Sequence, residues 1–196
     1  MKNTKIILLC FLFTAFAVFT QAVIKTKAGI IISSSDKFQK LKSNSVVKSS
    51  DKFRILLQPE SVGYAYFVMI EGGYATLLNF GKVYKNQRMV YPAKTNFAPF
   101  ANKGKYRFYL IFSPNKLNKI DQLFAKSGRI VDSKFLKIIN EISKGKPNIT
   151  DDNPDDIMIA GNTRGKQEEI DTDFLKKFKA FTNKGEMLLE YNIIVK

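Results

Sequence analysis

Alternating apolar and polar positions dominate the middle third of the chain. Residues 52–58 place Phe53 and Leu57 on an apolar face and Arg54 on a mainly polar one. This alternation predicts a strand with one face in the core and the other largely in water. Residues 64–70 are apolar at both sets of alternating positions, which predicts a central strand whose second face is covered by another element.

Glycine and proline divide this region into short extended segments. Gly72 and Gly73 predict a hairpin turn, because glycine accepts a positive φ at both turn positions. Residues 33–50 are too polar for a central strand, so we expect an edge strand or a surface crossing there. Residues 81–88 and 93–103 are predicted loops. Strands are expected at residues 23–32, 52–58, 64–70, 74–80, 89–91 and 105–113.

After Pro114 the apolar period changes from two to that of amphipathic helices. Two helices are expected at 117–124 and 131–142, and a third is expected to begin at a Thr172 cap. The third would carry Phe174, Leu175, Phe178 and Phe181. Short strands are expected at 157–160 and 187–195. Together, these strand and helix patterns predict a β-dominated α+β fold. We expect an antiparallel immunoglobulin-like β-sandwich, with two or three amphipathic helices in the C-terminal half covering one side.

Residues 1–22 have the order of segments found in secretory signal peptides. A short basic start precedes an apolar run, and small residues precede a cut near Ala22. The run is shorter than the roughly 20 apolar residues of a membrane anchor, and bulky residues before Cys10 argue against a lipoprotein. We therefore expect export to the periplasm or the exterior. A single exported domain would span 23–196, with a β-core at 50–114 and a helical cover and last strand at 115–196.

Residue counts exclude several chemistries. The chain has no His, and Cys10, in the leader, is its only cysteine. Ser-His-Asp hydrolysis, Cys-His proteolysis and zinc sites built from His or Cys are therefore excluded. We expect no enzyme activity, no catalytic residue, no metal and no cofactor.

Acidic residues leave two weaker alternatives open. A carboxylate-based hydrolase would need acids from scattered positions, and the sequence brings no two of them together. The acidic cluster at 151–156 places carboxylates where they could hold calcium, but Asp156 stands where an EF-hand needs glycine. A solvated acidic turn is the favoured interpretation. The scattered acids are Glu60, Glu71, Glu141, Glu168 and Glu169.

The charge is strongly basic and uneven. Lys and Arg total 32 against 17 acids, and residues 82–137 hold thirteen basic residues against two acidic ones. Such a field would attract anionic lipids or acidic wall polymers, with nucleic acid not expected after export. The alternative is a merely solvated surface, because lysine outnumbers arginine 27 to 5 and arginine forks are the usual phosphate ligands. The candidate binding residues, all in the predicted loops, are Lys82, Lys85, Arg88, Lys94, Phe97, Phe100 and Lys103.

The middle of the chain, about residues 50–114, resembles the bacterial domain of unknown function 4384. Four groups of residues carry this resemblance in order. They are Ser50-Asp51 with Phe53-Arg54-Ile55; Gly63-Tyr64-Ala65-Tyr66 with Gly72-Gly73; Thr76-Leu77-Leu78-Asn79-Phe80 with Val90-Tyr91-Pro92; and Gly104-Lys105-Tyr106-Arg107-Phe108 with Ser113-Pro114. The resemblance implies an exported β-sandwich-like accessory module. It assigns no activity and no catalytic residue.

Two functional hypotheses follow. The first is a non-enzymatic exported accessory module, of a bacterial envelope or secretion-related system, that binds a protein or an envelope component. The second is direct binding of anionic envelope polymers or lipids through the lysine-rich face. The two differ in what the loops contact, and Asp51 to Ser113 would be scaffold in both.

Overall fold

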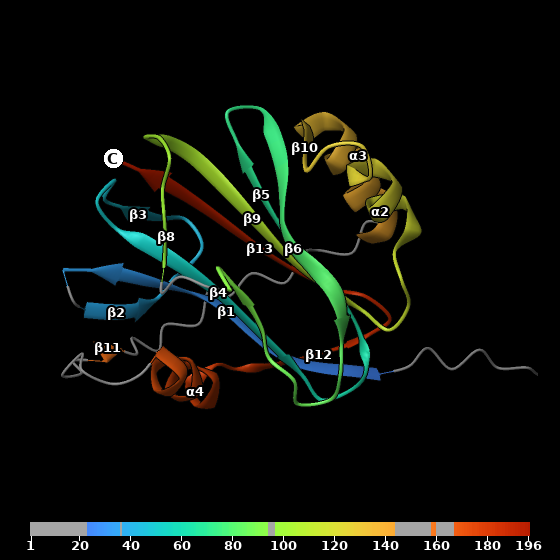
Figure 1. The fold of residues 1–196 in the computed structure, drawn as a ribbon, viewed down its shortest axis with the longest axis horizontal. Coiled ribbons are helices and arrows are strands. Elements are labelled where there is room, and N and C mark those ends of the chain that lie inside the picture. Colours follow the sequence, from blue (N-terminus) through green and yellow to red (C-terminus); the bar gives the residue numbers. More distant parts are fainter. Residues whose placement is uncertain (1–22, 36, 94–96, 144–157, 160–166) are drawn as a thin grey trace, which may run out of the picture.

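Two β-sheets pack face to face, with helices on both outer faces, in a computed structural model of the chain (Figure 1). The structure describes residues 23–35, 37–93, 97–143, 158–159 and 167–196. The predicted leader and the acidic cluster at 151–156 lie outside this part. The β-rich α+β class predicted from the sequence is confirmed.

The first sheet is built around β1 and β4, which pair antiparallel along most of their length. Its strand order is β11-β2-β1-β4-β7; β12 also pairs with β1, and β8 with β4. The strands are β1 (Val23–Ser34), β2 (Lys37–Lys40), β4 (Lys52–Pro59), β7 (Met89–Tyr91), β8 (Ala98–Pro99), β11 (Met158–Ile159) and β12 (Ala180–Lys184).

The second sheet has β5 and β9 at its centre. The apolar residues at 64–70 predict this central position for β5. Its order is β10-β6-β5-β9-β13-β3; only the β13–β3 pair is parallel among its described strands. The strands are β3 (Ser45–Val47), β5 (Gly63–Glu71), β6 (Tyr74–Val83), β9 (Gly104–Ser113), β10 (Arg129–Val131) and β13 (Met187–Val195).

The main core lies between the sheets. Inward-facing side chains such as Phe53, Leu57, Phe67 and Phe108 are all buried there. Gly72 and Gly73 make the predicted hairpin turn between β5 and β6, with φ of 56° and 79°. The inward-facing residues of the alternating strands thus make up this core, as expected for packed sheets.

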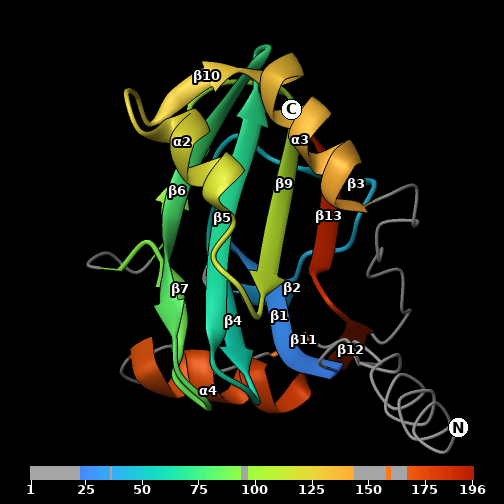
Figure 2. The same cartoon turned by 90° about the vertical axis from the view of Figure 1, so that its right-hand side faces the viewer.

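Helices α2 (Asn118–Phe124) and α3 (Asp132–Ser143) cover the outer face of the second sheet (Figure 2). Phe124 and Phe135 pack on Tyr66 and Tyr109 of that face in a second buried cluster. This explains why β5 is apolar on both faces. The residues just before α3, including Val131, instead form β10, an edge strand beside β6 that the sequence analysis missed.

Helix α4 (Gln167–Lys177) covers the outer face of the first sheet, on the opposite side of the molecule. Its Phe174 and the following Phe178 pack on Ile31 and Leu56. The prediction that all helices cover one side is therefore wrong. So is the prediction that one face of β4 is largely wet: Arg54 and Leu56 are buried beneath this helix.

Three predicted boundaries are also wrong. The third helix begins five residues before the expected Thr172 cap, and Phe181 belongs to β12 rather than to the helix. Residues 81–83, predicted as loop, continue β6. The immunoglobulin-like topology stays a prediction. Among the described residues, no helix has the length and apolar character needed to cross a bilayer.

Candidate functional site

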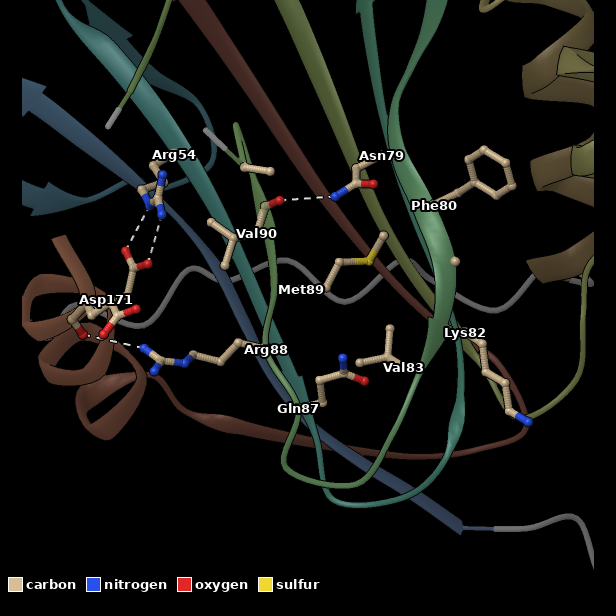
Figure 3. A pocket seen from close by; sticks show the side chains of 13 residues that line it. Arg54, Asn79, Phe80, Lys82, Val83, Gln87, Arg88, Met89, Val90 and Asp171 are labelled. Carbon is tan, nitrogen blue, oxygen red and sulfur yellow. Dashed lines mark hydrogen bonds and ion pairs between the residues drawn. The ribbon is translucent and has the colours of Figure 1, made fainter. Parts of the chain in front are cut away.

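A cleft of about 590 Å³ lies where the edges of the two sheets face each other (Figure 3). β6 forms one wall, β7 the floor and α4 the far wall. We call it the edge cleft. Its lining residues are Arg54, Asn79, Phe80, Gly81, Lys82, Val83, Gln87, Arg88, Met89, Val90, Ala93, Glu168 and Asp171.

Both strands at the edge cleft present an open edge. β6 pairs with β5 along its whole length, but β10 covers only Tyr74–Thr76 on its other side, and Leu77 bonds to Gly128. Within the described part of the chain, residues 78–83 have no strand neighbour there. Among the described strands, β7 likewise pairs with β4 alone. Backbone N–H and C=O groups along such edges can pair with another chain.

One side chain bridges the two edges. Asn79 Nδ2 donates to the carbonyl oxygen of Val90 at 3.0 Å. The register of β6 against β5 shifts by one residue just before Asn79, so Leu78 is the extra residue of a β-bulge. Because a bulge re-aims neighbouring side chains, it accounts for Asn79 pointing across to β7.

A tight turn presents the cations of the cleft. Tyr84 and Gln87 close it with two hydrogen bonds: Gln87 N donates to Tyr84 O at 2.9 Å, and Tyr84 N donates to Gln87 Oε1 at 3.0 Å. Asn86 lies in the left-handed region at a φ of 62°. The turn leads from β6 to Arg88, whose side chain points toward α4, whereas the Lys82 side chain points the other way (Figure 3).

Arg88 is held by α4. Its Nη1 donates to Thr172 Oγ1 at 3.1 Å and to the carbonyl oxygen of Glu168 at 3.4 Å. Lys82 Nζ lies 5.3 Å from the centre of the Tyr84 ring. Among the described residues, neither cation forms an ion pair with a carboxylate.

A buried ion pair closes the deep end of the cleft. Arg54 Nε and Nη2 donate to the two carboxylate oxygens of Asp171 at 2.8 and 2.9 Å, and Nη1 donates to the carbonyl oxygen of Pro92 at 2.9 Å. The side chains of Arg54 and Asp171 are only 6% and 5% exposed. This two-pronged pair docks α4 on β4 and neutralises the only buried carboxylate of the cleft lining.

The side chains of the edge cleft offer charged and apolar groups that a ligand could contact. Asp171 is engaged by Arg54, and the other lining acid, Glu168, is exposed on α4. Burial raises the pKa of the nearby Tyr91 phenol. Phe80, 54% exposed, adds an apolar surface on the same side of β6 as Lys82 (Figure 3). Cations, an exposed ring and open strand edges suit an extended anionic ligand.

The predicted binding residues lie in different parts of the structure. Lys82 and Arg88 line the edge cleft, and Lys85 lines an adjoining small hollow. Lys103 lies in a different groove. Lys94 lies outside the described residues.

The two predicted loop aromatics do not project. Phe97 stacks on Phe38 with ring centres 5.3 Å apart. Phe100 is 7% exposed and packs on Phe53, with ring centres 5.1 Å apart. Phe100 as a contact residue is therefore wrong, because its ring fills the end of the sheet core.

Sequence reasoning missed Arg54, Asp171 and Asn79. Arg54 and Asp171 are 117 positions apart, so no local spacing links them. One signal was present: Leu56 is apolar on the supposedly wet face of β4. An apolar residue next to an arginine there indicates a covering element.

No protein-family model, no curated protein and no solved structure matches this chain. The resemblance to the domain of unknown function 4384 therefore stays a prediction.

Proposed function

We propose that this chain is a non-enzymatic exported accessory module, built on an immunoglobulin-like sandwich, that binds an acidic extended segment of a partner protein at the edge cleft. The observation that carries this proposal is the free edge of β6 at residues 78–83, beside Lys82 and Arg88. A bound segment would add a strand to that edge. Main-chain hydrogen bonds supply affinity in this mode of recognition, and side-chain pockets supply specificity.

The positive charges near the β6–β7 turn favour a partner segment with acidic side chains. Lys82, Lys85 and Arg88 lie within seven residues of the chain at the β6–β7 turn, and none of the three is ion-paired within the described residues. Glu168 is the nearest exposed lining acid. A partner with alternating carboxylates would place them beside these cations, and long-range attraction would raise its association rate.

A continuous lysine-rich face for polymers or lipids is less well supported. Lys82 pairs with Tyr64 at one end of β5, whereas Tyr106 of β9 pairs with Glu71 at the other. Seven residues of strand separate these ends, roughly 24 Å. The cations of residues 82–107 are therefore distributed over two ends, which favours a local site over a broad charged surface.

A direct test uses a labelled peptide of about ten residues with alternating Glu and Val. Fluorescence anisotropy should report saturable binding, and a peptide with Lys in place of Glu should bind much more weakly. The double variant Lys82→Glu/Arg88→Glu should weaken binding about tenfold or more, equivalent to about 1.4 kcal/mol. Lys103→Glu/Lys105→Glu makes the same charge change at the other end and should have little effect.

A second arm tests the strand-addition geometry. N-methylation of alternate residues along one edge of the peptide should abolish binding, because it removes the N–H donors that would face β6. Methylation of the other residues should be tolerated. Equal affinity for the Glu and Lys peptides, or no binding at about 1 mM, would contradict the proposal.

A further inference from the structure

The β6 wall of the edge cleft has a gap at Gly81, which we call the Gly81 hollow. Gly81 pairs with Ala65 of the main core, so the Gly81 position faces the space between the two sheets. Among the described residues, and leaving out its two chain neighbours, no heavy atom lies within 4 Å of a Cβ built on Gly81. Since Ala65 is also small, neither strand places a large side chain there.

The side chains nearest to the hollow are mainly apolar. Val83 and Met89 are 3% and 8% exposed, and both line the edge cleft together with Val90. Figure 3 shows the Val83 and Met89 side chains extending into the space between β6 and β7. An apolar group entering beside Gly81 would therefore contact these side chains.

The polar side chains beside the hollow are already engaged. Asn79 Nδ2 donates to the carbonyl oxygen of Val90, and Gln87 Oε1 accepts the N–H of Tyr84. The cations point elsewhere, because Arg88 is directed at α4 and Lys82 projects from the other face of β6 (Figure 3). The Gly81 hollow therefore suits an uncharged ligand group.

Strand addition to β6, the mode of binding proposed above, decides which partner residue meets the hollow. In an antiparallel pair, residues directly opposite each other point to the same face, with Cβ atoms about 4.5–5.5 Å apart. The partner residue opposite Gly81 therefore points between the sheets, and the next residue, opposite Lys82, points outward. An aromatic ring opposite an edge glycine packs over the bare backbone, the effect known as aromatic rescue.

We infer that the edge cleft selects segments in which an aromatic residue stands next to an acidic one. The aromatic side chain enters the Gly81 hollow, and the carboxylate meets Lys82 on the other face of the sheet. Gly81 is then the specificity-determining residue, because its missing side chain makes the room for the ring. This inference rests on the proposed function and adds the identity of the anchoring side chain.

The test compares peptides that differ at one position. The parent is the labelled ten-residue peptide of alternating Glu and Val, and its central Val is replaced by Phe or by Ala. In fluorescence anisotropy, the Phe peptide should bind wild-type protein at least about tenfold more tightly than the Ala peptide.

Filling the hollow from the protein side is the decisive variant. Gly81→Leu occupies the space of the ring, so the Phe and Ala peptides should bind it with affinities within about threefold of each other. Gly81→Ala adds one methyl group in open space and should keep the preference for Phe. Lys82→Glu is the matched control: it should weaken both peptides and leave the ratio of their affinities unchanged.

The outcomes separate this inference from the proposed function. Equal affinity of wild-type protein for the Phe and Ala peptides overturns the inference, even if Gly81→Leu fails to fold. A tenfold preference that persists in a folded Gly81→Leu overturns it as well. Equal affinities that still fall in Lys82→Glu would leave strand addition standing, whereas no binding of any peptide at about 1 mM would contradict both.

Discussion

The edge cleft and the opposite end of the molecule hold their arginines in opposite ways. At the edge cleft, Arg54 is buried against Asp171 and serves to dock a helix, while the accessible cations come from the β6–β7 turn. At the groove beside the Gly72–Gly73 turn, the hairpin groove, Arg107 lies half-exposed on the sheet face, with its Nε 3.4 Å from Glu190 Oε1. Antiparallel pairing distributes one basic stretch of sequence over both ends. A charge run in the sequence is therefore not the same thing as a charged surface.

The largest expected effect is loss of the buried pair at the edge cleft. Asp171→Ala removes the two-pronged carboxylate partner of the buried Arg54, so the free energy of unfolding should fall by about 3–5 kcal/mol, measured by urea denaturation. At the other end, Glu190→Ala disturbs a partly exposed pair and should cost about 1 kcal/mol or less.

A double variant separates charge from packing at the same position. Arg54→Met/Asp171→Leu removes both charges and keeps apolar volume, so it should recover most of the stability lost in Asp171→Ala. If Asp171→Ala costs no more than Glu190→Ala, the contrast between a buried and an exposed pair is wrong.

A smaller effect is expected where β5 begins, near the edge cleft. A Cβ at Gly63 would lie 2.5 Å from the Phe112 ring and 2.6 Å from the carbonyl oxygen of Ser113. Since backbone must shift, Gly63→Ala should destabilise the fold by about 1–3 kcal/mol. Gly81, also in a strand at this end, has open space at its Cβ, so Gly81→Ala should change stability by no more than about 0.5 kcal/mol. Equal unfolding midpoints for the two variants would contradict tight packing at Gly63.

Much of the fold follows from local pattern, because period two and period 3.6 are properties of neighbouring residues. The central position of β5 and its covered second face were predicted from residues 64–70 alone. The helix that covers β4 was not placed there, since the contact between Leu56 and Phe174 joins segments far apart in the sequence. The edge cleft was half predicted: Lys82 and Arg88 are local to one turn, but Asp171 arrives from α4.

The smallest expected effect concerns two buried tyrosines, one near each end. Burial raises the pKa of Tyr66, which stacks on Phe80 of the edge cleft, to about 12. Burial, with the hydrogen bond and charge of Glu71, raises the pKa of Tyr106 at the hairpin groove to about 12 against opposing bonds to the Asn102 backbone. Both phenols should therefore ionise well after exposed tyrosines, whose ordinary pKa is about 10.

The sign of the linked stability change follows from which state loses its protons first. Between about pH 10 and 12 the unfolded phenols are ionised while the folded ones are still protonated, so ionisation favours unfolding and stability falls as pH rises. Tyrosinate absorbance, which no Trp obscures, measures the two late transitions, and Tyr66→Phe and Tyr106→Phe assign them. Glu71→Gln removes the negative charge beside Tyr106 and should lower the pKa of that phenol alone. A shift of both phenols would mean that the two ends are electrostatically coupled, and the separation drawn between the edge cleft and the hairpin groove would then fail.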